Sequence, residues 1–124
     1  MQRTLLTFAA ISGFLSVALG AFAAHGLKSQ LNAGMLAVFR TGVEYQMFHT
    51  LALIGVALLI KQHQEQRLLR LSGCSFIVGI FLFSGSLYAL ALGAPRIVGI
   101  ITPLGGLSFL VGWLAMALLA WRLP

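Results

Sequence analysis

Acidic side chains are almost absent from this chain of 124 residues. It has no aspartate, and its two glutamates, Glu44 and Glu65, stand against eight lysines and arginines, so the formal net charge is +6. Only 8% of the residues are charged, against about 25% in a typical soluble domain. An ordinary globular fold in water is therefore excluded.

The same scarcity excludes the common catalytic arrangements. Without aspartate there is no Ser-His-Asp triad, and a carboxylate pair would have to join Glu44 to Glu65. The three histidines, two glutamates and one cysteine show no metal-ligand spacing. A haem held by His25 and His49 is disfavoured, because counting from the helix ends separates them by ~10 Å in depth. We expect no enzyme, no metal site and no cofactor.

Cysteine is scarce as well, and the basic residues are dispersed. The single Cys74 cannot form an internal disulfide. Lysines and arginines stand singly near the ends of apolar stretches, which is how multispanning membrane proteins carry cations, and they form no stripe of the kind that binds nucleic acid. We therefore expect no nucleic-acid partner. These residues are Arg3, Lys28, Arg40, Lys61, Arg67, Arg70, Arg96 and Arg122.

Long uncharged stretches are what the chain has in abundance. Residues 71–94 and 97–121 contain no charge, and a hydrocarbon core ~30 Å thick needs about 20 helical residues to cross it. Only a helix or a closed barrel satisfies its backbone in lipid, and these stretches lack the alternation of barrel strands. We predict an all-α membrane protein, one domain over residues 1–124. It is an up-down bundle of four transmembrane helices, at about residues 4–24, 35–60, 71–93 and 97–121.

Two further features refine this bundle. Thr102 followed by Pro103 matches an N-cap with proline at the first helical position, so we expect a break there and a separate short turn at 97–101. A continuous kinked helix is the alternative. Five basic residues lie on the side of the termini and the 61–70 loop, and three on the other, which predicts cytoplasmic N- and C-termini.

Small residues recur every four residues on the first span, and at spacings of three and four on the last. Such stripes let helix backbones approach closely in lipid. We interpret them as packing surfaces within the bundle. A homo-oligomer contact, or a contact with another membrane protein, is the alternative. The stripes are Ser12, Ser16, Gly20 and Ala24, and Gly105, Ser108, Gly112 and Ala115.

The second span carries most of the polar side chains. Arg40 and Glu44 share one helix face, and Tyr45 and His49 share another. An ionisable group inside a bilayer is costly unless it is paired, so it normally faces the bundle interior. We expect Glu44 to pair there with Arg40 or His25.

Matching depths across the four spans places these residues in one zone of the outer half of the bundle. His49 lies deepest among them, and we expect it to be neutral at pH 7, with Ser84 as its partner. The zone is either a hydrogen-bonded network that fixes helix register or a ligand or proton site. The candidate site residues are His25, Arg40, Glu44, Tyr45, His49, Ser84, Tyr88 and Thr102.

Four motifs of this chain resemble the YgdD-like family of small inner-membrane proteins. They are GAFAAH at residues 20–25, TGVEYQMFH at 41–49, LFSGSLY at 82–88 and TPLGG at 102–106. They occur in order and cover nearly the whole chain, with one departure at Ala23, where the family motif usually has glycine. The resemblance implies a four-helix protein of the bacterial inner membrane, and it brings no established biochemical function.

Two functions fit these expectations. The first is an accessory, scaffolding or small-ligand-binding role in the lipid bilayer, through the polar zone. The alternative is a small proton-coupled transporter using Glu44 and His49. Four-span multidrug exporters also carry a lone membrane glutamate, but theirs lies centrally in the first helix, whereas Glu44 lies near the outer end of the second.

Overall fold

The computed structural model describes residues 1–63 and 66–124, and the regular elements of these residues are all helical. They form four spans, each long and apolar enough to cross a membrane, so the predicted fold class is confirmed. The third span is built from α3, the π-turn η1 and α4 in succession. The elements are α1 (Gln2–His25), α2 (Ala33–Gln62), α3 (Gln66–Gly79), η1 (Ile80–Ser84), α4 (Gly85–Ala91), the 3-10 turn η2 (Arg96–Ile100) and α5 (Ile101–Arg122).

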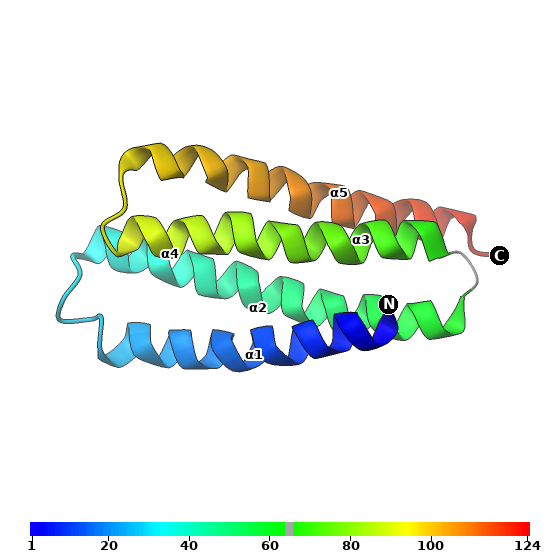
Figure 1. Ribbon diagram of the computed structural model, residues 1–124, viewed down its shortest axis with the longest axis horizontal. Helices are drawn as coiled ribbons and strands as arrows, with labels where there is room; N and C mark the ends of the chain where they lie inside the picture. Colours follow the sequence, from blue (N-terminus) through cyan, green and yellow to red (C-terminus); the bar gives the residue numbers. More distant parts are fainter. Residues whose placement is uncertain (64–65) are drawn as a thin grey trace.

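The spans lie side by side in up-down order (Figure 1). α1 packs on α2, α5 packs on α3 and η1, and α2 contacts the whole third span between them. α1 and α3 begin at the same end of the bundle and run parallel. Both neighbouring helices extend into the 61–70 stretch, since α2 continues to Gln62 and α3 starts at Gln66. Gln64 and Glu65 lie outside the described residues, and so does the pairing of Glu65 with Glu44.

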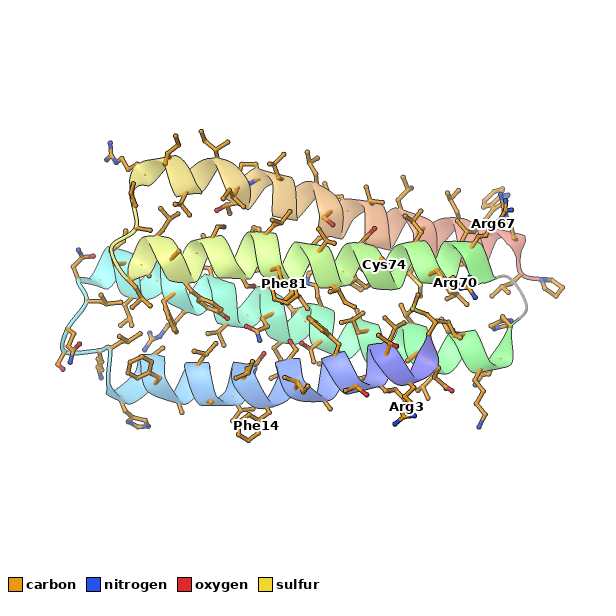
Figure 2. The ribbon with its side chains drawn as sticks, viewed as in Figure 1. Arg3, Phe14, Arg67, Arg70, Cys74 and Phe81 are labelled. Atoms are coloured by element: carbon orange, nitrogen blue, oxygen red, sulfur yellow. The ribbon has the colours of Figure 1, made fainter. Side chains whose placement is uncertain are left out.

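Large apolar side chains cover the outside of every span. Phe14 is 74% exposed, Phe81 65% and Leu110 63%. Phe14 projects from α1 away from the other helices (Figure 2). Soluble monomers rarely expose apolar patches beyond a few hundred Å². Hydrocarbon is the solvent that accepts such a surface.

The last span has its break slightly earlier than the sequence predicts. The 3-10 turn η2 ends at Ile100 and α5 follows without interruption, so the separate short turn is present. Thr102 is not the N-cap: it lies inside the first turn of α5, and its hydroxyl meets the Ser86 hydroxyl at 2.5 Å. Pro103 also falls in this first turn, where a missing N–H costs no intrahelical bond.

Glycines on α5 bring it directly against the third span. A Cβ at Gly105 would lie 2.3 Å from the backbone nitrogen of Phe83, and one at Gly112 would lie 2.5 Å from the Phe76 ring. On α1, Ser12 is likewise buried, bonded to a side chain of α2. The α5 stripe, and Ser12 and Ser16 of the α1 stripe, therefore serve packing within the bundle. Ala24 does not: it is exposed, and its neighbour Ala23 is buried.

The neighbouring glycines of α5 give a matched test of this packing. Gly105→Ala should lower the free energy of unfolding by about 1–3 kcal/mol, because its methyl group meets backbone that cannot yield. Gly106→Ala is the control, since a Cβ there lies 3.9 Å from the Phe83 ring, in ordinary contact. Reversible unfolding in detergent measures both variants. Equal stability of the two proteins would contradict the close approach of α5.

Candidate functional site

A single buried amide links three helices. The Gln46 side chain of α2 is 5% exposed. Its Nε2 donates to the backbone oxygen of Ser12 at 3.0 Å and to the Ser12 hydroxyl at 3.2 Å, both on α1. Its Oε1 accepts from the Tyr88 hydroxyl of α4 at 2.6 Å. Gln46 thus joins α1, α2 and α4 through one side chain.

Two hydroxyls close a ring of hydrogen bonds around this amide. The Thr50 hydroxyl donates to the backbone oxygen of Gln46 at 2.6 Å. Since a hydroxyl has one proton, the 2.7 Å contact between Ser12 and Thr50 is donated by Ser12. The ring runs from the Gln46 amide to Ser12, to Thr50 and back to Gln46. Ser16 adds a bond to the Ser12 backbone oxygen at 2.8 Å. Each hydroxyl donor in the ring is used.

Tyr88 is held in place on α2 from both sides. Its ring lies over Gly42, where a Cβ would come within 2.7 Å of a ring carbon, and it packs on Phe39 with centroids 4.8 Å apart. One turn away, the Ser84 hydroxyl donates to the Gly42 backbone oxygen at 2.7 Å. The third span therefore docks on α2 at Gly42, where any larger residue would meet the Tyr88 ring.

A groove lies beside this polar core, where the third span makes its π-helical turn. Gly85 N–H donates to the Ile80 backbone oxygen, five residues back, and nothing lies within 4 Å of a Cβ built at Gly85. The groove has a volume of about 310 Å³, is partly open, and runs between α1 and the third span with Gln46 at its floor. Its surface is almost entirely carbon, because the core's polar atoms bond to one another. Its lining also includes Phe8, Ile11, Ser12, Leu15, Leu19, Ile80, Phe81 and Tyr88.

His49 faces another part of the bundle, among aromatic rings of α3 and α5. Its Nδ1 lies 2.7 Å from the Tyr45 backbone oxygen, and its Nε2 accepts from the Trp113 indole N–H at 3.0 Å. The ring stacks on Phe109, with centroids 3.6 Å apart. A carbonyl only accepts and an indole N–H only donates, so His49 is neutral with its proton on Nδ1.

The predicted partnership of His49 with Ser84 is wrong. Ser84 lies at the level of Gly42, seven residues and about 10 Å along α2 from His49. Counted from the neighbouring ends of the two helices, Ser84 lies seven residues from Ala91 and Gly42 lies nine residues from Ala33. His49 lies sixteen residues from Ala33, which is about two turns too deep to meet Ser84.

The predicted ion pair of Glu44 is wrong as well. Glu44, Arg40 and His25 are all exposed, and within the described part of the chain no ion pair joins the carboxylate to either base. Residues turn by 100° along a helix, so Glu44 points away from the face that buries Gln46. The bundle interior at this level is filled by uncharged groups.

The candidate residues thus divide among several environments. Ser84 and Tyr88 dock on α2, His49 lies in the aromatic cluster, Tyr45 is 39% exposed, and Thr102 bonds to Ser86. Within the described residues, no three His, Cys, Asp or Glu side chains come close enough to hold a metal ion. Sequence reasoning missed the hub role of Gln46, together with Ser12, Thr50 and Trp113. The four-residue spacing of Gln46 and Thr50 was the available signal.

These features define a small four-span membrane protein with an uncharged polar core. The chain belongs to the family described as "Protein of unknown function (DUF423)", which matches residues 19–106. That result confirms the family resemblance of the four motifs.

Curated relatives match the chain along nearly its whole length. A "UPF0382 membrane protein" of Haemophilus influenzae is 52% identical over 94% of this chain and 93% of that protein. The "UPF0382 inner membrane protein YgdD" of Escherichia coli is 48% identical over 98% and 92%, respectively. The "UPF0382 membrane protein YwdK" of Bacillus subtilis is 40% identical over 96% and 97%. No solved structure matches the chain.

The His49 geometry gives a spectroscopic prediction. In protein labelled with ¹⁵N-histidine and reconstituted in lipid at pH 7, Nδ1 should give the shift of a protonated ring nitrogen and Nε2 that of an unprotonated one. Trp113→Phe removes the donor and should change the Nε2 signal, while Trp121→Phe, whose ring is 89% exposed, should leave it unchanged. A doubly protonated His49, or the opposite tautomer, would contradict the assignment.

Proposed function

We propose that this protein binds the apolar part of a lipid, or of another lipophilic molecule, inside the bilayer. The ligand occupies the groove between α1 and the third span. The observation that carries the proposal is the groove itself, about 310 Å³ of space beside a core whose polar atoms are bonded to one another. Small-molecule sites begin at about this size, near 300 Å³.

The closed hydrogen-bond ring selects for an apolar ligand. A polar ligand in the groove would have to break the bond of Tyr88 to Gln46 or leave its own groups unpaired in hydrocarbon. A hydrocarbon chain makes neither demand and gains dispersion contacts with Phe8, Leu15 and Phe81. Binding by shape and apolar contact therefore suits this surface.

The transporter alternative has less support from the geometry. Its two residues, Glu44 and His49, are five positions apart on α2, about 140° around the helix. Glu44 is exposed on the outside, and both ring nitrogens of His49 already have partners. We propose a binding role without catalysis, in the inner membrane, with both termini in the cytoplasm.

Two glycines with open Cβ positions provide the test. Gly85 lines the groove and Gly55 does not, and neither has an atom within 4 Å of a built Cβ. A palmitic acid carrying a diazirine, added to protein in nanodiscs and activated by light, should label α1 between Ile11 and Leu19 and the third span near Phe81. Gly85→Phe should lower this labelling severalfold, because the phenyl ring occupies the groove. Gly55→Phe should leave it unchanged.

Folding is checked by thermal unfolding of both variants, with Gly85→Leu as a smaller replacement if the phenylalanine variant is unstable. Labelling spread evenly over all lipid-facing positions would contradict the proposal. So would groove labelling that Gly85→Phe and Gly85→Leu leave unchanged.

A further inference from the structure

We infer that two copies of this chain pair in the membrane through α2, with Arg40 of each copy bonded to Glu44 of the other. The groove lies on the side of α2 that carries Gln46, whereas Arg40 and Glu44 lie on its exposed side. The inference therefore goes beyond the proposed function and does not rest on it.

Glu44 lies at the depth of the lipid chains, on the outside of the bundle. Ser84 is seven residues inside the end of the third span at Ala91, and its hydroxyl bonds to Gly42. Glu44 is two residues deeper on α2, which places it about 13 Å from that end at 1.5 Å per residue. An ionisable group at this depth is costly unless it is paired, and it normally faces the bundle interior. Glu44 is exposed instead, and none of the described residues bonds to its carboxylate.

Arg40 lies one turn before Glu44 on the same helix and is also exposed, with no ion pair to any described residue. Side chains on a helix lean toward its N-terminus, so Arg40 leans away from the carboxylate four residues after it. A basic residue placed before an acidic one is also the weaker order for a pair at this spacing. Both charges are therefore available to a second molecule.

The two charges complement a second copy of the same face. Two copies inserted in the same orientation are related by a two-fold axis along the membrane normal, so α2 meets α2 in parallel. Arg40 of one copy then lies four residues, or about 6 Å, from the level of Glu44 in the other, a step that the long arginine side chain can bridge. The contact occurs twice, and the two acids and two bases sum to zero charge.

Exposed side chains continue this face along α2 with the spacing of a paired helix. After Glu44, residues Phe48, Leu51, Gly55 and Leu58 follow at steps of four and three, and each is at least partly exposed. This is the seam pattern of a coiled coil, the geometry in which most transmembrane helices also pack. Nothing lies within 4 Å of a Cβ built at Gly55, so the seam has room there. A second copy would cover the charges and the apolar side chains together.

Disulfide cross-linking in membranes locates the contact. The full chain carries Cys74→Ser, which removes its one cysteine, and then either Leu51→Cys in the seam or Phe14→Cys on the outward face of α1 as the control. Oxidation should join the Leu51→Cys chains into a dimer several times faster than the Phe14→Cys chains. Equal rates would overturn the inference. So would a Leu51→Cys chain that is joined to another protein in place of a second copy.

Charge reversal distinguishes a pair between copies from a pair within one copy. In the Leu51→Cys background, Arg40→Glu puts two acids on the face and Glu44→Arg puts two bases there, so each variant alone should lose most of its dimer. Co-expressed with tags of different size, the two variants should form the mixed dimer, because the acids of one chain meet the bases of the other. Neither chain can form an ion pair at these positions by itself.

Arg40→Ala is the milder variant, used if a reversed chain does not accumulate in the membrane. It should lower the dimer yield severalfold, since it leaves Glu44 of the other copy without its base. A dimer yield that these substitutions leave unchanged would overturn the inference. Co-expressed reversed chains that form no more mixed dimer than either variant forms alone would overturn it as well.

Discussion

The structure depends on one constraint: a polar group inside hydrocarbon needs a partner within the protein. Gln46 has more hydrogen-bonding capacity than any other buried side chain in the described spans, and its amide is used on both sides, by Ser12 of α1 and Tyr88 of α4. Because the partners come from different helices, satisfying the amide also fixes how those helices meet. The glycine contact at Gly42 then lets the Tyr88 ring reach it.

The same constraint shapes the surface that is left for a ligand. Once Ser12, Thr50 and Gln46 have bonded to one another, the groove beside them presents carbon. Gly85, which follows the π-turn, leaves that groove open because it has no side chain. Charged groups are placed elsewhere: Glu44 on the outside of α2 and Arg3 exposed near the start of α1. The buried polar side chains of the described residues are serines, a threonine, a glutamine and a neutral histidine, with no acidic or basic group among them.

The class of fold followed from the length of the uncharged stretches, and the packing faces followed from the spacing of Ser12, Gly105 and Gly112. The pairing of polar side chains did not follow: Ser84 bonds to the backbone of Gly42, and a backbone oxygen that accepts a bond carries no signal in the sequence. The groove was not predicted, because it depends on how α1 and the third span pack together and has no sequence pattern of its own. Glu44 was assigned to the interior on the cost of burying a charge, but an uncharged glutamine occupies that place.

A double-mutant cycle on Gln46 and Tyr88 tests the central claim most directly. Gln46→Leu, Tyr88→Phe and the double variant are unfolded reversibly in detergent, with their free energies of unfolding measured. Each single variant leaves a polar group of the other residue unpaired, so their effects should not add, and a coupling of about 0.5–2 kcal/mol should appear. Additive effects, with no coupling between the two side chains, would contradict the hydrogen-bonded core on which this account rests.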